Sequence, residues 1–418
     1  MEELDLNWLS SWPLILLEPP PAPRPPLNPF LSFSVLISGY VNLNHGSFGS
    51  TPRVVLEAQR AFTQQMEAMP DPWFRAGTDG YRQLVVEARQ MMADYMNVTD
   101  PADLTIVENA SSGVNAVFRS MKFNAGDKIL ITSTAYSMVK NLCHYLGERY
   151  GVITVTVQLV FPLTSNDDIL RPVAAAIAEH GSSIKLASFS HIDSVPGFIL
   201  PASELVRLCR ASGIRTFIDG AHAIGQIPIN IAEMDPDYYV TNAHKWLYTP
   251  RGCSPFYVRK EFQAEVSPTV VSSEWSSGQF LANFAYTGTR DYTPFVSLRA
   301  ALQFRESMGG DAAIHAYLRN LSWFAGTHLA AKWGTATIVP QFMIGAMIDV
   351  ELPVVDMAEG EALRHAIFEE YNMYFITHQL QGRVFTRLSA QIYLEQADFV
   401  LFGERVLETL ARLRAAKK

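Results

Sequence analysis

Lys245 is the residue of this sequence whose surroundings most favour chemistry. It stands in Thr241-Asn-Ala-His-Lys-Trp246, directly after the β-rich run Asp237–Val240. Burial at the end of a strand lowers the pKa of a lysine, and a neutral amine forms a Schiff base with a carbonyl compound. Taken alone, the motif equally fits an interfacial lysine whose stem packs along Trp246.

Three further polar clusters follow β-rich runs in the same way. Asn109-Ala-Ser-Ser-Gly113 opens a helix, where free amides and the helix dipole favour a phosphate, although such a sequence also serves as an N-cap. Asp219-Gly-Ala-His222 supplies a carboxylate that needs a partner or caps the next turn. The last cluster is Ser190-His-Ile-Asp-Ser194. A phosphate cradle, an acid and a lysine are together what a pyridoxal 5'-phosphate (PLP) enzyme requires.

A sheet is needed to bring these clusters to one edge. Apolar periodicity predicts helices at 53–69, 80–96, 114–121 and 202–211. β-rich runs predict strands at 104–107, 128–132, 153–157, 184–189, 215–218 and 237–240. Their alternation indicates an α/β fold with a mostly parallel sheet flanked by helices, in which ligands bind at the carboxyl ends of the strands.

Composition narrows the class of protein. The 418 residues include 33 Lys and Arg against 41 Asp and Glu, a net charge of −8, which argues against nucleic-acid or anionic-membrane binding. The three cysteines form no CxxC pair and no disulfide framework, which favours a reducing compartment. No apolar run approaches the roughly 20 residues that span a bilayer. We therefore expect a cytoplasmic protein without bound metal or membrane contact.

The chain divides into three expected segments. Residues 1–39 contain the Pro-rich stretch Glu18–Phe30, expected as a disordered extended leader or a gene-model artefact, with an SH3-type ligand as the alternative. Residues 40–305 are expected to form a large PLP-binding α/β domain, with 40–80 carrying a substrate loop. The helix-rich residues 306–418, with strands at 336–351, are expected to form a smaller C-terminal α+β domain.

Several motifs together resemble one enzyme family. They are Tyr40-VNLNHGSFGSTP-Arg53, Asn109-ASSG, Asp219-GAHAIG, His244-Lys245-Trp and Tyr286-TGTRD. The chain from about residue 40 is similar to class V aminotransferases, PLP enzymes of fold type I. It most resembles the isopenicillin N epimerase-like branch, which includes cysteine desulfhydrases and hercynylcysteine sulfoxide lyases.

The resemblance implies a role for each matching residue on the cofactor side. Lys245 matches the Schiff-base lysine, and Asp219 matches the acid that pairs with the pyridinium nitrogen. His222 and Ser194 fall where family members contact the phenolic oxygen. Residues that match phosphate contacts are Ala110, Ser111, Ser112, Asn242 and His244. Thr289 is similar to the residue that reaches the phosphate from the partner subunit, which implies a homodimer.

On the substrate side, Arg387 matches the arginine that holds the α-carboxylate, and a planar guanidinium suits a bidentate carboxylate. Asn44 and His45 match the substrate loop. Tyr136 occupies the place where relatives put an aromatic or His ring over the cofactor, although Ala135-Tyr136 departs from the family pattern. The alternative for Tyr136 is a surface helix tyrosine.

The expected reaction is β-elimination from cysteine, an S-substituted cysteine or its sulfoxide, to pyruvate and ammonia. Lys245 would remove the Cα proton, and Tyr136 or His45 would assist the departing sulfur. Family desulfurases carry a nucleophilic cysteine shortly before the carboxylate-binding arginine, and residues 371–387 contain none. Amino-acid epimerisation, PLP-dependent cyclisation or condensation, and transamination stay open, and a non-catalytic scaffold is disfavoured by the intact Lys245, Asp219 and Arg387.

Overall fold

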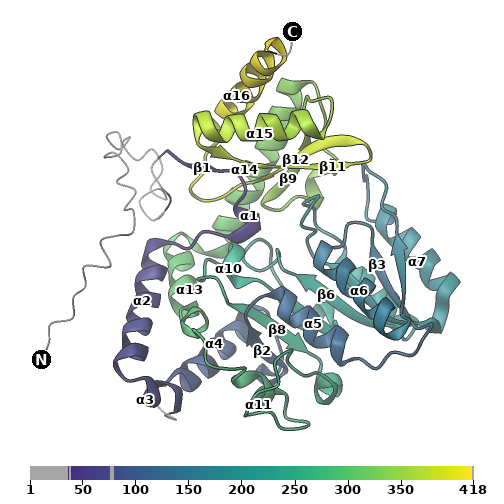
Figure 1. Cartoon of the computed structure of the whole chain (residues 1–418), viewed down its shortest axis with the longest axis vertical. Coiled ribbons are helices and arrows are strands. Elements are labelled where there is room, and N and C mark those ends of the chain that lie inside the picture. The colour runs from purple at the N-terminus through teal and green to yellow at the C-terminus, as the bar shows by residue number, and fades with distance from the viewer. Residues whose placement is uncertain (1–35, 37–38, 76–79, 417–418) are drawn as a thin grey trace, which may run out of the picture.

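The computed structural model describes residues 36, 39–75 and 80–416. The Pro-rich leader, with its proposed extended conformation and SH3-type motif, lies outside the described residues. A seven-stranded sheet forms the centre of the larger part (Figure 1). Its spatial order is β2 (Leu104–Val107), β8 (Ser254–Val258), β7 (Tyr238–Thr241), β6 (Arg215–Gly220), β5 (Ile184–Ser190), β3 (Lys128–Thr132), β4 (Ile153–Val157).

All six strands expected in this sheet are present, and five of them pair in parallel. The seventh, β8, was not predicted; it runs antiparallel between β7 and β2. Central strands are buried on both faces, as β7 and β8 show throughout their length, because helices cover the sheet. The covering helices include α5 (Ala110–Ser120), α6 (Ser137–Tyr150), α7 (Asp167–His180) and α8 (Ala202–Ala211).

A second, antiparallel sheet lies toward the C-terminus (Figure 1). Its order is β11 (Ile376–Leu380), β12 (Arg383–Ser389), β9 (Met347–Glu351). The helices packed around it are α14 (Gly310–Trp333), α15 (Met357–Tyr371) and α16 (Gln396–Ala415). Of the strands expected at 336–351, the structure contains β9 and a single bridge at Thr337. The β11–β12 hairpin was not predicted; Gln381 and Gly382, both with positive φ, form its turn.

The N-terminal segment joins the two sheets. The short strand β1 (Val41–Asn42) pairs in parallel with β10 (Met373–Tyr374) beside the C-terminal sheet. The chain then forms α1 (His45–Phe48), which packs on α10 (Ala243–Trp246), and continues into α2 (Arg53–Ala68) and α4 (Tyr81–Tyr95). The predicted domain boundary after residue 305 falls inside α13 (Leu298–Ser307). The division of the chain into two domains stays a prediction. Within the described ranges no helix is long and apolar enough to cross a membrane.

Candidate active site

Lys245 lies on the one-turn helix α10, directly beyond β7. Its Nζ is 2.9 Å from Nε2 of His222, and the indole N–H of Trp246 donates to Nδ1 of His222 at 3.3 Å. Because Nδ1 accepts, a neutral His222 carries its proton on Nε2 and donates it to a neutral lysine amine. Burial, assisted by the charge of Arg387, lowers the pKa of Lys245 to about 7. Near neutral pH a substantial fraction of this lysine is therefore present as the unprotonated amine.

Asp219 stands at the end of β6, the strand beside β7. Its Oδ1 accepts a hydrogen bond from the backbone N–H of Ala221 at 3.0 Å. Burial raises the pKa of Asp219, and the nearby charge of Lys245 opposes that shift. The carboxylate and the amine thus interact across the carboxyl edge of the sheet, as strand order predicts.

The loop that opens α5 is tied to the lysine turn. Asn109 is the N-cap, and its Oδ1 accepts from the N–H of Ser112 at 3.0 Å. The N–H of Ala110 donates to Oδ1 of Asn242 at 2.8 Å. Asn242 is three residues before Lys245 in the sequence. Its hydrogen bond therefore fixes the position of the loop that carries Ser111 relative to Lys245. The helix N-terminus, the acid and the amine meet at one edge of the sheet.

Arg387 reaches this edge from β12 of the other sheet, and its side chain is buried. Nη1 donates to the carbonyl of Ser194 at 2.8 Å, while Nη2 donates to Oδ1 of Asn44 and to Oγ of Ser47 at 3.1 Å. Burial lowers the pKa of Arg387 to about 10, so the guanidinium stays charged. In the described part of the chain no carboxylate lies within ion-pairing distance of it, which leaves a buried positive charge facing the lysine.

His45 contacts the backbone of the lysine turn rather than its amine. Nε2 lies 2.6 Å from the carbonyl of Lys245, so Nε2 carries the proton, and Nδ1 accepts from the hydroxyl of Tyr393 at 2.9 Å. Burial lowers the pKa of His45 to about 4, which keeps it neutral. Both ring nitrogens are therefore occupied, and the histidine holds α10 in place.

The remaining predicted residues have mixed placements. Ser194 accepts from Arg387 through its carbonyl at 2.8 Å and its hydroxyl at 3.4 Å, and its contact with the cofactor stays a prediction. Tyr136 precedes α6, is about half exposed at 48%, and interacts electrostatically with Arg387, so its ring borders the site. His244 lies 3.3 Å from the carbonyl of Cys253 through Nδ1. Thr289 is exposed, with its hydroxyl 2.5 Å from that of Tyr286, and its reach across a dimer stays a prediction.

Sequence reasoning missed residues that support the lysine turn from behind. Arg305, 1% exposed, donates to the carbonyls of Trp246 and Gly225 at 2.9 and 3.1 Å. The sequence could have indicated that Arg305 is buried, because it falls on the apolar stripe that Leu298 and Ala301 form along α13. Ser47 lies in a family motif and Tyr393 at a departure from the family pattern, but neither was assigned a contact, since their partners come from distant segments.

Gly49 packs directly against the lysine turn. A Cβ at this position would lie 2.0 Å from the carbonyl oxygen of His244, and φ is +70°. We expect Gly49→Ala to lower the free energy of unfolding by about 3 kcal/mol or more, since the clash adds to left-handed strain. Gly126→Ala, with φ of +90° and open space around its Cβ, is the control and should cost about 1 kcal/mol. Urea unfolding of both variants measures the difference; equal losses would contradict the clash.

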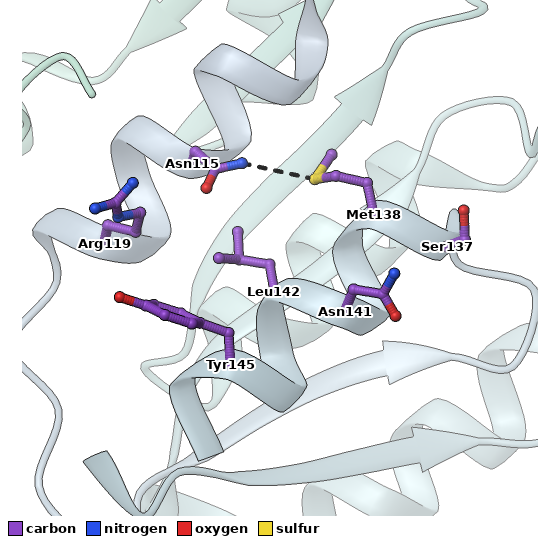
Figure 2. A pocket seen from close by; sticks show the side chains of 7 residues that line it. All are labelled: Asn115, Arg119, Ser137, Met138, Asn141, Leu142 and Tyr145. Carbon is purple, nitrogen blue, oxygen red and sulfur yellow. Dashed lines mark hydrogen bonds between the residues drawn. The ribbon is translucent and has the colours of Figure 1, made fainter. Parts of the chain in front are cut away.

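An open surface groove of about 640 Å³ lies between α5 and α6 (Figure 2). Asn115 and Arg119 line one side, and Met138, Leu142 and Tyr145 line the other, with Asn115 Nδ2 3.8 Å from the Met138 sulfur. None of the predicted site residues lines this groove, so it is separate from the cluster around Lys245.

Comparison with known proteins decides the family. The model of the family "Aminotransferase class-V" matches residues 43–357, a stretch that includes Asp219 and Lys245. The chain belongs to the aminotransferase class-V family. Among class-V relatives, L-cysteine desulfhydrase of Arabidopsis thaliana is 31% identical over 76% of this chain and 72% of its own. Isopenicillin N epimerase of Streptomyces clavuligerus is 30% identical over 86% of this chain and 92% of its own.

A solved structure supports the α/β fold. It is that of a C-DES mutant with glycine covalently linked to the PLP cofactor, 21% identical to this chain. It covers 90% of this chain and 96% of its own, with a TM-score of 0.74. This likeness confirms the predicted α/β fold, and the match to the family model confirms the family resemblance.

Proposed function

We propose that this class-V protein binds PLP and catalyses β-elimination from cysteine or an S-substituted cysteine or its sulfoxide. The observation that carries the proposal is the buried amine of Lys245, which lies 2.9 Å from His222 and interacts electrostatically with Asp219 and Arg387. An unprotonated lysine in that position serves both as a covalent anchor and as a base. The related cysteine desulfhydrase supports sulfur as the leaving group.

The residues present fit PLP. A phosphate suits the N-terminus of α5, which the Ala110–Asn242 hydrogen bond fixes beside the lysine turn. A pyridinium nitrogen suits Asp219, whose carboxylate is buried at the adjacent strand end. When bound there, PLP supplies an electron sink for the carbanion at the substrate Cα.

The chain's own groups divide the remaining work. Arg387 binds the α-carboxylate, and its Nε, buried without a partner, is a donor still to be satisfied. Lys245 takes the Cα proton, while His222 and the His45 contact to its carbonyl keep the amine aimed at that proton. With both nitrogens of His45 occupied, Tyr136 is the residue we propose to assist the departing sulfur.

The proposed bond changes are balanced. The Cα–H bond breaks as its proton passes to Lys245, and the Cβ–S bond breaks as sulfur leaves with its electron pair. The remaining dehydroamino acid adds water and yields pyruvate and ammonia.

A persulfide on the protein is not part of the proposal. The residues before Arg387 form β11 and β12 and contain no cysteine. Cys143, Cys209 and Cys253 are free and buried, and burial raises the pKa of each thiol to about 12. A nucleophilic thiolate would need the opposite shift.

Pyruvate release tests the proposal. PLP-loaded protein is incubated with L-cysteine, S-methyl-L-cysteine and S-methyl-L-cysteine sulfoxide, and pyruvate is measured by its reduction to lactate. We expect pyruvate from at least one of them, with stoichiometric ammonia. If amino acids shift the cofactor absorbance without releasing pyruvate, the proposed lyase activity is wrong. Exchange of the Cα hydrogen with deuterium then tests epimerisation.

A further inference from the structure

Asp349 shares a sheet face with Arg387. The two residues are directly paired across β9 and β12, and Ile376 of β11 is paired with Arg387. Residues opposite each other, or two apart on one strand, point to the same face. His378 of β11 therefore joins Asp349 and Arg387 on this face, which packs against Gly197 in the loop between β5 and α8.

The carboxylate of Asp349 is held close to the guanidinium of Arg387 but not on it. Asp349 is 2% exposed, and its Oδ2 accepts the backbone N–H of Gly197 at 2.5 Å. Its Oδ1 lies 3.2 Å from Nε2 of His378. The charges of Asp349 and Arg387 interact, yet the pair does not reach ion-pairing distance. The two terminal nitrogens of Arg387 bond to neutral acceptors instead.

This placement has two consequences. A carboxylate in direct contact would pair with Nε of Arg387 and neutralise its charge, so holding it back leaves Nε without a partner for a substrate carboxylate. A fixed negative charge nearby also opposes the arrival of a second anion. The same arrangement weakens retention of pyruvate, the carboxylate product of the proposed reaction.

We propose that Asp349 is a positioning residue that anchors Gly197 and whose charge lowers the affinity of Arg387 for the α-carboxylate of substrate and product. This inference rests on the proposed function only in assigning the α-carboxylate to Arg387. It does not depend on which reaction follows.

The effect of Asp349 varies with pH. Burial raises the pKa of Asp349 to about 7, so its charge is present above neutrality and lost as the pH falls to 6. The groups that face it are His378, whose pKa burial lowers to about 4, and Arg387, with a pKa lowered to about 10. Neither changes charge between pH 6 and 8.5. Lys245 also has a pKa of about 7, so each variant is compared with the wild type at the same pH.

The test uses Asp349→Asn in the PLP-loaded protein. Asparagine keeps an oxygen for Gly197 and removes the charge. L-alanine, which has an α-carboxylate and no leaving group, is titrated against the cofactor absorbance, with ethylamine as the ligand that lacks a carboxylate. At pH 8.5 we expect the Kd for L-alanine to fall about tenfold, since one unit charge several ångströms away is removed, while the Kd for ethylamine is unchanged. At pH 6 the variant and the wild type should converge.

Glu351→Gln is the matched control. Glu351 lies on the same face of the same strand, ion-paired with the exposed Arg383, and its loss should leave both Kd values unchanged. An unchanged or higher Kd for L-alanine in a stable Asp349→Asn variant overturns the inference. If that variant is unstable, the test is made on the wild type. The Kd for L-alanine divided by the Kd for ethylamine should decrease when the pH is lowered from 8.5 to 6, and a constant ratio overturns the inference. No absorbance change with L-alanine in the wild type refutes the proposed cofactor site itself, whereas absence of pyruvate alone does not.

Discussion

Lys245→Ala is expected to abolish turnover, with a loss of at least about a thousandfold in kcat. The substitution removes both the base that takes the Cα proton and the amine that anchors PLP. It also leaves Nε2 of His222, 2.9 Å from the lysine amine, without that partner. Because α10 is held by backbone contacts to His45 and Arg305, the fold should survive the change.

Borohydride reduction separates these roles. Reduction of the PLP-loaded wild type should fix a pyridoxyl group on the peptide that contains Lys245, seen as an added mass. The Lys245→Ala protein should show no such mass on that peptide. Lys332→Ala, which changes a lysine paired with Glu404 on the surface of α14, is the control and should behave as the wild type. A Lys245→Ala variant that keeps its labelled peptide or its turnover would refute the assignment.

Arg387→Lys is expected to raise KM for L-cysteine about 10- to 100-fold, with a smaller change in kcat. Lysine keeps the positive charge but loses the planar fork that contacts Ser194, Asn44 and Ser47 together. The loss should be specific to the carboxylate. Cysteamine, which is cysteine without its carboxylate, should be used equally well by the variant and the wild type.

Arg383→Lys is the control for this substitution. Arg383 lies on the same strand, is exposed, and pairs with Glu351 outside the site. Its replacement should leave KM for L-cysteine unchanged. If Arg387→Lys raises KM for cysteine and cysteamine alike, Arg387 shapes the pocket but does not bind the α-carboxylate.

The sequence predicted the parallel strands because buried strands of this kind are short, continuous apolar runs followed at once by polar residues. Lys245, Asp219 and the Asn109 cap were found for that reason. The antiparallel strand β8 was missed, and Pro255 within it weakens a strand pattern. The β11–β12 hairpin was missed because its residues are only partly buried on β11, which blurs the alternation.

Contacts between distant segments could not be predicted from local pattern. Arg387 bonds to residues more than 190 positions away, and His45 is 200 positions from Lys245. Asp349 gave a partial signal, an acid within the apolar run Met347–Val350, and such an acid needs a tertiary partner that a single strand does not reveal.

The pairing of Val41–Asn42 with Met373–Tyr374 determines when the site around Lys245 can be completed during synthesis. Loop closure over more than 300 residues is required before this strand pair forms. The helix α1 that follows β1 supplies His45 to the lysine turn, and Asn44 supplies an acceptor to Arg387. A ribosome-bound chain in which β10 and β12 have not yet been made has the lysine, the acid and the helix N-terminus but lacks Arg387 and the strand that pairs with β1. The complete site therefore forms only when translation is nearly finished.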